Sequence, residues 1–242
     1  MQNDFHKKST TEEIARRFDA DVERFSNLES GQVAIIDAPV LMELLAKAAV
    51  AATPAINNVL DIGCGAGNNT IRLLRENKTD FACDLCDLSL PMLRRARERV
   101  AAETAKPVRV FHTDFRLMES PDAAYDVILA AAVLHHLRDD DDWRAVFAKI
   151  FRLLRPGGSV WISDVVFHEN ERVHEMMWSR YGRHLEQIGG VEYRGKVFDC
   201  IDKEDTPRPL TCQLDLLRAS GFAKTEVLHK NCCSAAFGAI KI

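Results

Sequence analysis

The spacing of apolar residues predicts two amphipathic helices near the start of the chain. Between about Thr10 and Phe25, apolar side chains recur every three or four positions, which is the period of one helix face. This segment opens with Thr-Thr-Glu-Glu, a sequence typical of a helix N-terminus. A second segment, from about Pro39 to Ala51, has the same spacing. We expect residues 1–55 to form an N-terminal helical arm.

A different pattern begins after residue 57, where short apolar runs alternate with helical segments. Each run has the length and composition of a buried β-strand. The predicted strands span Asn58–Ile62, Asp80–Leu85, Val108–Thr113, Tyr125–Ala130 and Gly158–Ser163, and the helices between them begin near Asn69, Pro91, Ser120 and Asp141. Such alternation is typical of right-handed βαβ units, which place parallel strands side by side.

Residues 165–209 interrupt this alternation. The segment His174–Ile188 has helical spacing, whereas residues 189–209 are polar and rich in turn formers, so we expect an insertion above the sheet. The alternation resumes with a helix at Gln213–Ser220. Two strand-like segments follow, Lys224–His229 and Ala235–Lys241, and their short link predicts an antiparallel hairpin.

The predicted fold class is therefore α/β, with a doubly wound sheet of seven strands that is mostly parallel and has one antiparallel strand. Residues 56–242 form this domain, and the insertion at about 165–209 belongs to it. We expect the insertion and the arm of residues 1–55 to make a helical cap over the sheet.

Composition narrows the classes of partner. Of 242 residues, 47% are hydrophobic and 28% charged, and the net charge is −4, so no field over the whole molecule attracts DNA or anionic lipid. The polar N-terminal residues and the lack of an apolar run of membrane-spanning length favour a cytoplasmic protein without membrane contact.

The seven cysteines stand mostly in apolar surroundings, which fits reduced thiols rather than disulfides. We interpret Cys83 and Cys86 as small strand hydrophobes, because no further zinc ligands stand at comparable spacing.

Two charged runs have simple structural interpretations. The acidic run Asp139–Asp142 is expected to favour a helix N-terminus by its charge rather than to hold a cation. The basic run Arg94–Arg99 is expected to consist mostly of solvated side chains on a helix rather than of a nucleic-acid patch.

Three glycines, Gly63, Gly65 and Gly67, stand between the first predicted strand and the helix that follows it. A turn of this kind lets a ligand approach the main chain closely and directs free N–H groups at it. The spacing differs from the G-x-G-x-x-G pattern of dinucleotide-binding domains, since Asn68 occupies the place of the last glycine. A dehydrogenase is therefore disfavoured.

Five segments in order resemble the motifs of the class I S-adenosylmethionine-dependent methyltransferases, and of the small-molecule enzymes of types 11 and 12 among them. They are VLDIGCGAG (59–67), CDLSLPMLRRAR (86–97), FHTDF (111–115), YDVILAAAVLHHL (125–137) and LLRPGGSVWISD (153–164). The resemblance covers Val59–Asp164, just under half of the chain. It implies a Rossmann-like fold, the cofactor S-adenosyl-L-methionine and the product S-adenosyl-L-homocysteine.

The resemblance also implies a set of cofactor-binding residues. By analogy, Asp87 accepts the ribose hydroxyls, Met92 packs on the adenine, and Asp114 binds the adenine amino group. Asp84 is the alternative acid if the register of the second strand is shifted. The complete set is Asp61, Gly63, Cys64, Gly65, Gly67, Asp87, Leu88, Met92, Asp114, Phe115 and Ala131.

On the acceptor side, the sequence predicts an in-line transfer of a methyl group to a small molecule, in a pocket that excludes water. His135 is the titratable residue expected nearest the methyl group, as a base or substrate contact, with a structural role as the alternative. No metal is expected, because Ala130, Ala131 and Ala132 offer no ligand to Mg²⁺. Candidate substrate residues are Trp178, Tyr181 and Arg194, with His184, Tyr193, Arg24 and Phe25 as further lining candidates; surface packing is the alternative for each.

Other functions stay open at this stage. The arm, the insertion and the final strand are distantly similar to carboxy-S-adenosylmethionine synthases, in which an insertion arginine pairs with the transferred carboxylate. Arg194, Lys196 or Arg208 could serve here, although that family's asparagine after the fourth strand is Ala131 in this chain. A non-catalytic cofactor-binding module is a third interpretation. The sequence leaves open a tRNA or protein acceptor and does not decide the oligomeric state, for which a homodimer is one option.

Overall fold

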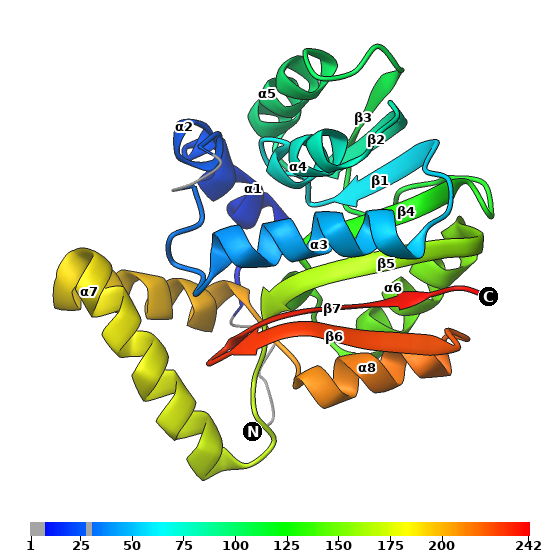
Figure 1. Cartoon of the computed structure of the whole chain (residues 1–242). Coiled ribbons are helices and arrows are strands. Elements are labelled where there is room, and N and C mark those ends of the chain that lie inside the picture. The colour runs from blue at the N-terminus through cyan, green and yellow to red at the C-terminus, as the bar shows by residue number, and fades with distance from the viewer. Residues whose placement is uncertain (1–7, 28–30) are drawn as a thin grey trace.

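A seven-stranded sheet forms the centre of the molecule in the computed structural model, which describes residues 8–27 and 31–242 (Figure 1). The strand order is β3-β2-β1-β4-β5-β7-β6, and β7 is antiparallel to both of its neighbours while the other paired strands are parallel. The strands are β1 (Asn58–Ile62), β2 (Ala82–Asp87), β3 (Val108–His112), β4 (Tyr125–Ala131), β5 (Leu154–Val165), β6 (Lys224–Asn231) and β7 (Ser234–Ile240). The predicted fold class is confirmed.

Helices lie on both faces of this sheet and at the end of its parallel strands. They are α1 (Thr11–Asp19), α2 (Val22–Phe25), α3 (Ala38–Ala52), α4 (Asn68–Glu76), α5 (Leu90–Ala101), the short 3₁₀ helix η2 (Leu134–His136), α6 (Asp140–Leu153), α7 (Glu171–Glu204) and α8 (Leu210–Ala219). Apolar residues of α3, α4 and α5 form one core with the sheet, and those of α6 and α8 form a second core. Because the parallel strands are buried between the two cores, they have continuous apolar runs rather than alternating ones.

The helix boundaries follow from local capping. Thr10 and Glu13 form a capping box at the start of α1, and the Ser89 hydroxyl accepts the Met92 N–H at the start of α5. Asp139 accepts the N–H groups of Asp141 and Asp142. The interpretation of the acidic run as a helix N-terminus is therefore confirmed.

Three local predictions were wrong. The first amphipathic segment is two helices rather than one, because the backbone leaves the helix at Ala20 and Asp21. Residues 118–124 form turns and irregular backbone instead of a helix near Ser120. Residues 191–204, which we expected to be turn-rich, are helical. Gly189 and Gly190 interrupt the helix, and the chain then resumes it, since Val197, Phe198 and Ile201 give the new segment an apolar face.

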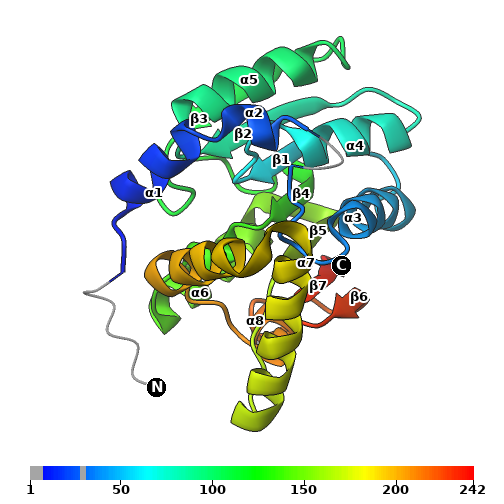
Figure 2. The same ribbon diagram turned by 90° about the vertical axis from the view of Figure 1, so that its left-hand side faces the viewer.

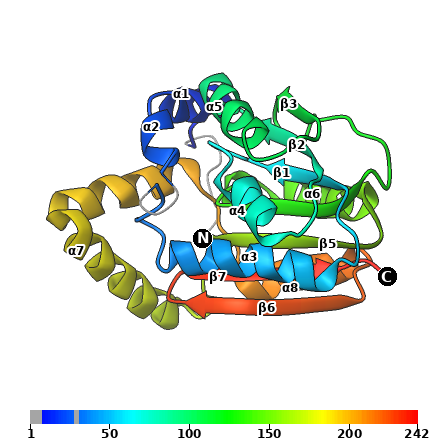
Figure 3. The ribbon, with the colours of Figure 1, turned by 45° about the horizontal axis from the view of Figure 1, so that its top comes forward.

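Helix α7 and the first two helices of the arm, α1 and α2, lie at the end of the sheet toward which the parallel strands point, whereas α3 packs on a face of the sheet and is not part of the expected cap (Figures 1 and 3). The two halves of α7 meet at the glycine pair, Gly189 and Gly190. The first half projects from the body of the molecule, and the second half returns across the strand ends (Figure 2). Tyr181 and Leu185 pack there with Cys232, Cys233 and Ile36 in a third, smaller apolar cluster. No helix of the described residues has the length and apolarity needed to cross a membrane.

Candidate functional site

A cavity of about 550 Å³ opens at the carboxyl ends of β1, β2 and β4, below α1, α2 and the second half of α7. Parallel sheets of this kind place their ligands at this edge, where the strand order reverses. Nine residues that the resemblance assigned to the cofactor line the cavity: Gly63, Cys64, Gly65, Asp87, Leu88, Met92, Asp114, Phe115 and Ala131.

The glycine turn presents bare backbone to this cavity. The N–H groups of Gly63 and Cys64 both donate to the Cys86 carbonyl oxygen, at 2.8 and 3.1 Å, which fixes the turn against β2. Gly65 has a φ of +50°, and a Cβ added there would meet no protein atom within 4 Å. The space beside Gly65 is therefore open to a ligand, and a side chain at this position would project into it.

The carboxylate of Asp87 lies directly beside this turn. Its Oδ2 accepts the Gly65 N–H at 2.8 Å and its Oδ1 accepts the Ser89 N–H at 2.9 Å. Burial raises the pKa of Asp87, although these N–H groups oppose the shift. Two N–H donors thus orient an acceptor group on the cavity wall.

The alternative acid, Asp84, is not among the residues that line the cavity. Its Oδ2 lies 2.5 Å from a guanidinium nitrogen of Arg109 and accepts the Tyr125 hydroxyl at 2.6 Å. Arg109 lies on the adjacent strand β3 and Tyr125 on β4, beyond β1, so Asp84 is engaged in a network within the sheet, away from the cavity. The geometry therefore favours Asp87 as the acid at the strand end.

Asp61 and Gly67 also stand outside the cavity lining. Asp61 is buried, and its Oδ2 accepts the Thr70 hydroxyl at 2.7 Å, while Oδ1 has no hydrogen-bond partner among the described residues. Burial raises its pKa to about 7. Gly67, with a φ of +84°, packs against Val100 and Ala96 of α5, where a Cβ would lie 2.9 Å from a Val100 methyl carbon.

The loop after β3 brings Asp114 and Phe115 to the cavity. Burial raises the pKa of Asp114, but the Arg116 side chain and N–H bind its carboxylate, and their net effect lowers the pKa below the usual value. Lys149 of α6 donates to the carbonyl oxygens of Phe115 and Met118. These contacts hold the loop, so its acid and aromatic ring have fixed positions.

Sequence reasoning missed the polar contacts that secure the glycine turn. The Asn68 amide donates to the Phe25 carbonyl oxygen at 2.9 Å, which ties the end of α2 to the start of α4. Arg99 donates to Asn68 Oδ1 and to the Ala66 carbonyl oxygen. At least this member of the basic run is therefore half-buried and structural rather than solvated. Its only sequence signal is its place on the α5 face that meets the turn.

His135 lies on the cavity wall between two carboxylates. Its ring Nδ1 bonds to Asp164 Oδ1, and its backbone N–H donates to Asp164 Oδ2 at 3.1 Å. Nε2 of the ring is 3.8 Å from Oδ1 of Asp205. Burial alone would lower the pKa of His135, but the charges of Asp164 and Asp205 outweigh it and raise the pKa to about 9. The two carboxylates thus stabilise the protonated form of the ring.

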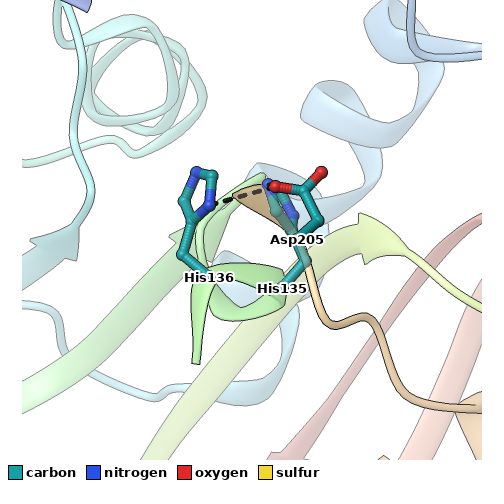
Figure 4. Close-up of side chains that lie close together, drawn as sticks. All are labelled: His135, His136 and Asp205. Atoms are coloured by element: carbon teal, nitrogen blue, oxygen red, sulfur yellow. Dashed lines mark ion pairs between the residues drawn. The ribbon is translucent and has the colours of Figure 1, made fainter. Parts of the chain in front are cut away.

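His136 lines the same wall, 3.1 Å from Asp205 through its Nδ1 (Figure 4). Asp164 and Asp205 were both missed as site residues. Asp164 is the last residue of the motif LLRPGGSVWISD and lies near the carboxyl end of β5, which pairs with β4. This position in the sequence could have identified it as a site residue. Asp205 follows α7, 70 residues after His135, and nothing local in the sequence connects the two.

The candidate substrate residues separate into two groups. Tyr181 and Tyr193 of α7, together with Arg24 and Phe25, line the cavity. Trp178, Arg194 and His184 are not among its lining residues: the Trp178 ring stacks on Phe198 at a centroid distance of 4.6 Å, Arg194 pairs with Glu186 across the glycine kink, and the His184 ring contacts the Val33 carbonyl oxygen.

The arm is fastened to the end of α7 above the cavity. The Ser9 N–H donates to the Lys203 carbonyl oxygen at 2.8 Å, and the Arg17 guanidinium binds both carboxylate oxygens of Glu204. Arg138, which follows η2, donates to the carbonyl oxygens of Ser9 and Glu204. Two chain segments far apart in the sequence are thus joined above the strand ends.

The chain is similar in sequence to known methyltransferases. Residues 59–158 match a family model described as a methyltransferase domain. An uncharacterized methyltransferase of Mycobacterium bovis is 36% identical over 108 residues, which are 45% of this chain and 50% of that protein. The chain thus spans about half the length of the curated relatives it matches.

Two solved structures are similar in fold. Human N-acetylserotonin methyltransferase in complex with S-adenosylmethionine has a TM-score of 0.58 and 17% identity, over 96% of this chain and 56% of that one. The (4+2)-cyclase SpnF has a TM-score of 0.64 and 17% identity, over 97% of each chain. At these identities the likeness is one of fold.

Proposed function

Because the chain belongs to the class I S-adenosylmethionine-dependent methyltransferases, we propose that it transfers the cofactor's methyl group to a small-molecule acceptor in the cavity beneath α1 and α7. The observation that carries this proposal is the hydrogen bond from the Gly65 N–H to Asp87, at an open position of the cavity wall. At this point of the cavity wall, a carboxylate acceptor and uncovered backbone lie side by side at the carboxyl ends of the strands.

The cavity lining is compatible with the proposed cofactor at three points. The oriented carboxylate of Asp87 would accept the ribose hydroxyls, as the oxygen of Asp114 would accept the adenine amino group. Met92 and Phe115, which are buried, offer apolar surface to the ring. The space beside Gly65 would admit the part of the ligand that passes closest to the main chain. When bound, S-adenosylmethionine supplies an electrophilic methyl carbon on its sulfonium sulfur, and the product is S-adenosylhomocysteine.

The protein's own contribution would be orientation and exclusion of water. Orienting two reactants in line can contribute on the order of 7 to 11 kcal/mol to catalysis. Helices α1 and α2 of the N-terminal arm and the insertion at about 165–209 would act as the cap that holds them, since Phe18 of α1 and Tyr181 and Val197 of α7 line the cavity. We propose that His135 acts on the acceptor. His135→Ala should then lower turnover much more than cofactor affinity, and equal losses in both would rule this role out.

The cavity's position beneath α1, α2 and the second half of α7 supports a small acceptor rather than a macromolecule, because a tRNA or protein would have to pass these helices to reach the methyl group. The carboxyl-transfer alternative gains no specific support. Arg194 and Arg208 are paired with Glu186 and Asp140 and do not appear among the cavity residues, and Lys196 alone of the three candidate cations lines it. All seven cysteines are free thiols, which supports a cytoplasmic location.

Mass spectrometry tests the proposal directly. Protein purified under native conditions is denatured, and the released small molecule is identified. S-adenosylmethionine or S-adenosylhomocysteine is expected, whereas a cofactor heavier by one carboxylate would support the carboxyl-transfer family, and NAD would overturn the proposal. The acceptor is then sought by incubation with methyl-labelled cofactor and cell extract. Label in the low-molecular-weight fraction is expected; label in tRNA or protein would contradict a small acceptor, and no transfer would favour a non-catalytic module.

A further inference from the structure

We propose that His135, His136 and Asp205 form a binding site for a divalent transition-metal ion on the wall of the cavity (Figure 4). One ring nitrogen of each histidine and one carboxylate oxygen all lie within 4.8 Å of one another. Oδ1 of Asp205 is 3.1 Å from Nδ1 of His136 and 3.8 Å from Nε2 of His135. Ligands bound to one ion at about 2.0 to 2.2 Å lie roughly 3 to 4 Å apart, so small side-chain rotations bring all three onto one ion.

The orientation of the His135 ring is the one that a metal ligand requires. Nδ1 bonds to the Asp164 carboxylate, which is 1% exposed and is itself held by the His135 and Val165 N–H groups. This leaves Nε2 as the nitrogen that faces Asp205. A carboxylate behind a ligating imidazole is the usual means of fixing its tautomer and ring orientation.

His136 provides an independent observation. Both of its ring nitrogens are buried, and neither has a well-directed hydrogen bond among the described residues, although Nδ1 is close to Asp205. A buried polar group without a partner costs free energy and calls for an explanation. An ion bound at Nδ1 would supply the missing partner. It would also neutralise the Asp205 carboxylate, which is 8% exposed.

The ligand set indicates the class of metal. Two imidazoles and one carboxylate, with further coordination positions open, are typical of Zn²⁺ and non-haem Fe²⁺ sites that act on substrates. All three residues line the cavity, so the open positions face the ligand space. The set also differs from the strand-end acids whose absence led us to expect no metal, because Asp205 comes from the segment after α7.

The consequence for catalysis rests on the proposed function. An acceptor hydroxyl bound at an open position would lose its proton to solvent more readily, because the ion stabilises the oxyanion. That oxygen would form a bond to the methyl carbon as the carbon–sulfur bond breaks and its electron pair stays on sulfur. The site thus favours acceptors that carry a hydroxyl group.

Metal binding is tested without cofactor or acceptor. Protein stripped with a chelator is titrated with Zn²⁺ by calorimetry and with Co²⁺ by visible absorption. We expect one ion per chain, with micromolar or tighter affinity and a Co²⁺ spectrum that shows nitrogen ligation. His136→Gln and Asp205→Asn should weaken binding at least tenfold. Asp164→Asn keeps all three ligands and should weaken it about 10- to 100-fold through the orientation of His135.

His229→Gln is the matched control, because His229 also lies beside an aspartate, 2.8 Å from Asp37, but outside the cavity. Its metal affinity should equal that of the unmodified protein. Absence of Zn²⁺ and Co²⁺ uptake, or equal binding by His136→Gln, would overturn the proposal and leave the cluster as a proton-sharing network. If Asp205→Asn does not fold, His136→Gln and the Co²⁺ spectrum still decide. If the protein binds S-adenosylmethionine but no metal ion, the metal site is excluded and the proposed function stands. If it binds the metal ion but no S-adenosylmethionine, the metal site stands and the proposed function is excluded.

Discussion

Arg17 of α1 donates two hydrogen bonds, of 2.7 and 2.5 Å, to the two carboxylate oxygens of Glu204, which lies 187 residues later at the end of α7. The Glu204 side chain is 8% exposed. The pair therefore joins the two segments above the cavity, α1 and the end of α7. Loss of the pair should destabilise both segments.

Arg17→Ala should destabilise the protein by about 2 to 3 kcal/mol, because it leaves a buried carboxylate without its cation. Urea unfolding measures this change. Arg218→Ala, which removes an exposed pair with Asp215 far from the cavity, is the control and should cost no more than about 1 kcal/mol. Equal losses in the two variants would mean that the contact between Arg17 and Glu204 adds nothing to stability.

Gly65→Ala should weaken S-adenosylmethionine binding at least tenfold, because the new methyl group enters space that the ligand requires. Calorimetry measures the affinity. Gly157→Ala is a matched control: Gly157 has a φ of +81° and also has no atom within 4 Å of an added Cβ, but it lies outside the cavity. Both variants should lose about 1 kcal/mol of stability through backbone strain. A similar loss of affinity in both would show that strain, not the site, is responsible.

Asp87→Asn and Asp84→Asn should separate the two candidate acids. The first should weaken cofactor binding by about 10- to 150-fold, the equivalent of about 1.5 to 3 kcal/mol for hydrogen bonds to a charged group. The second should leave the affinity nearly unchanged and lower stability, because Asp84 is paired with Arg109 and Tyr125. The opposite result would assign the ribose contact to Asp84.

Stability should depend on pH through Asp61. Burial raises its pKa to about 7 in the folded protein, against about 3.9 in an unfolded chain. Between these values the folded state holds a proton that the unfolded state has lost, so this contribution to stability falls as pH rises from about 4 to 7. The full shift corresponds to at most about 4 kcal/mol. Urea unfolding of the unmodified protein and of Asp61→Asn at several pH values should give curves that diverge over this range; parallel curves would contradict the shift.

The parts of the site that the sequence predicted are those in which one short segment contains both the structural and the chemical signal. Asp87 ends a buried strand and precedes a capped helix, so local pattern alone places it at the carboxyl end of that strand. Asp205 and Arg17 have no such signal, because their partners lie 70 and 187 residues away and only tertiary packing brings them together.

The error at α7 has a related cause. Residues 191–204 are polar on most of their surface and follow two glycines, which by local rules favours turns. Packing of Val197, Phe198 and Ile201 against the third apolar cluster overrides that preference. A contact between elements, rather than the propensity of the segment, determines the helix.

The fastening of the arm to α7 also sets an order of events during protein synthesis. Ser9 and Arg17 leave the ribosome almost two hundred residues before Lys203 and Glu204, so a growing chain carries the arm long before its binding partner exists. Contacts of such long range form late, after the intervening chain has been ordered. The ligand end of the sheet, formed by β1, β2 and β4, is therefore synthesised before the segment that covers it, whereas β6 and β7 follow that segment in the chain.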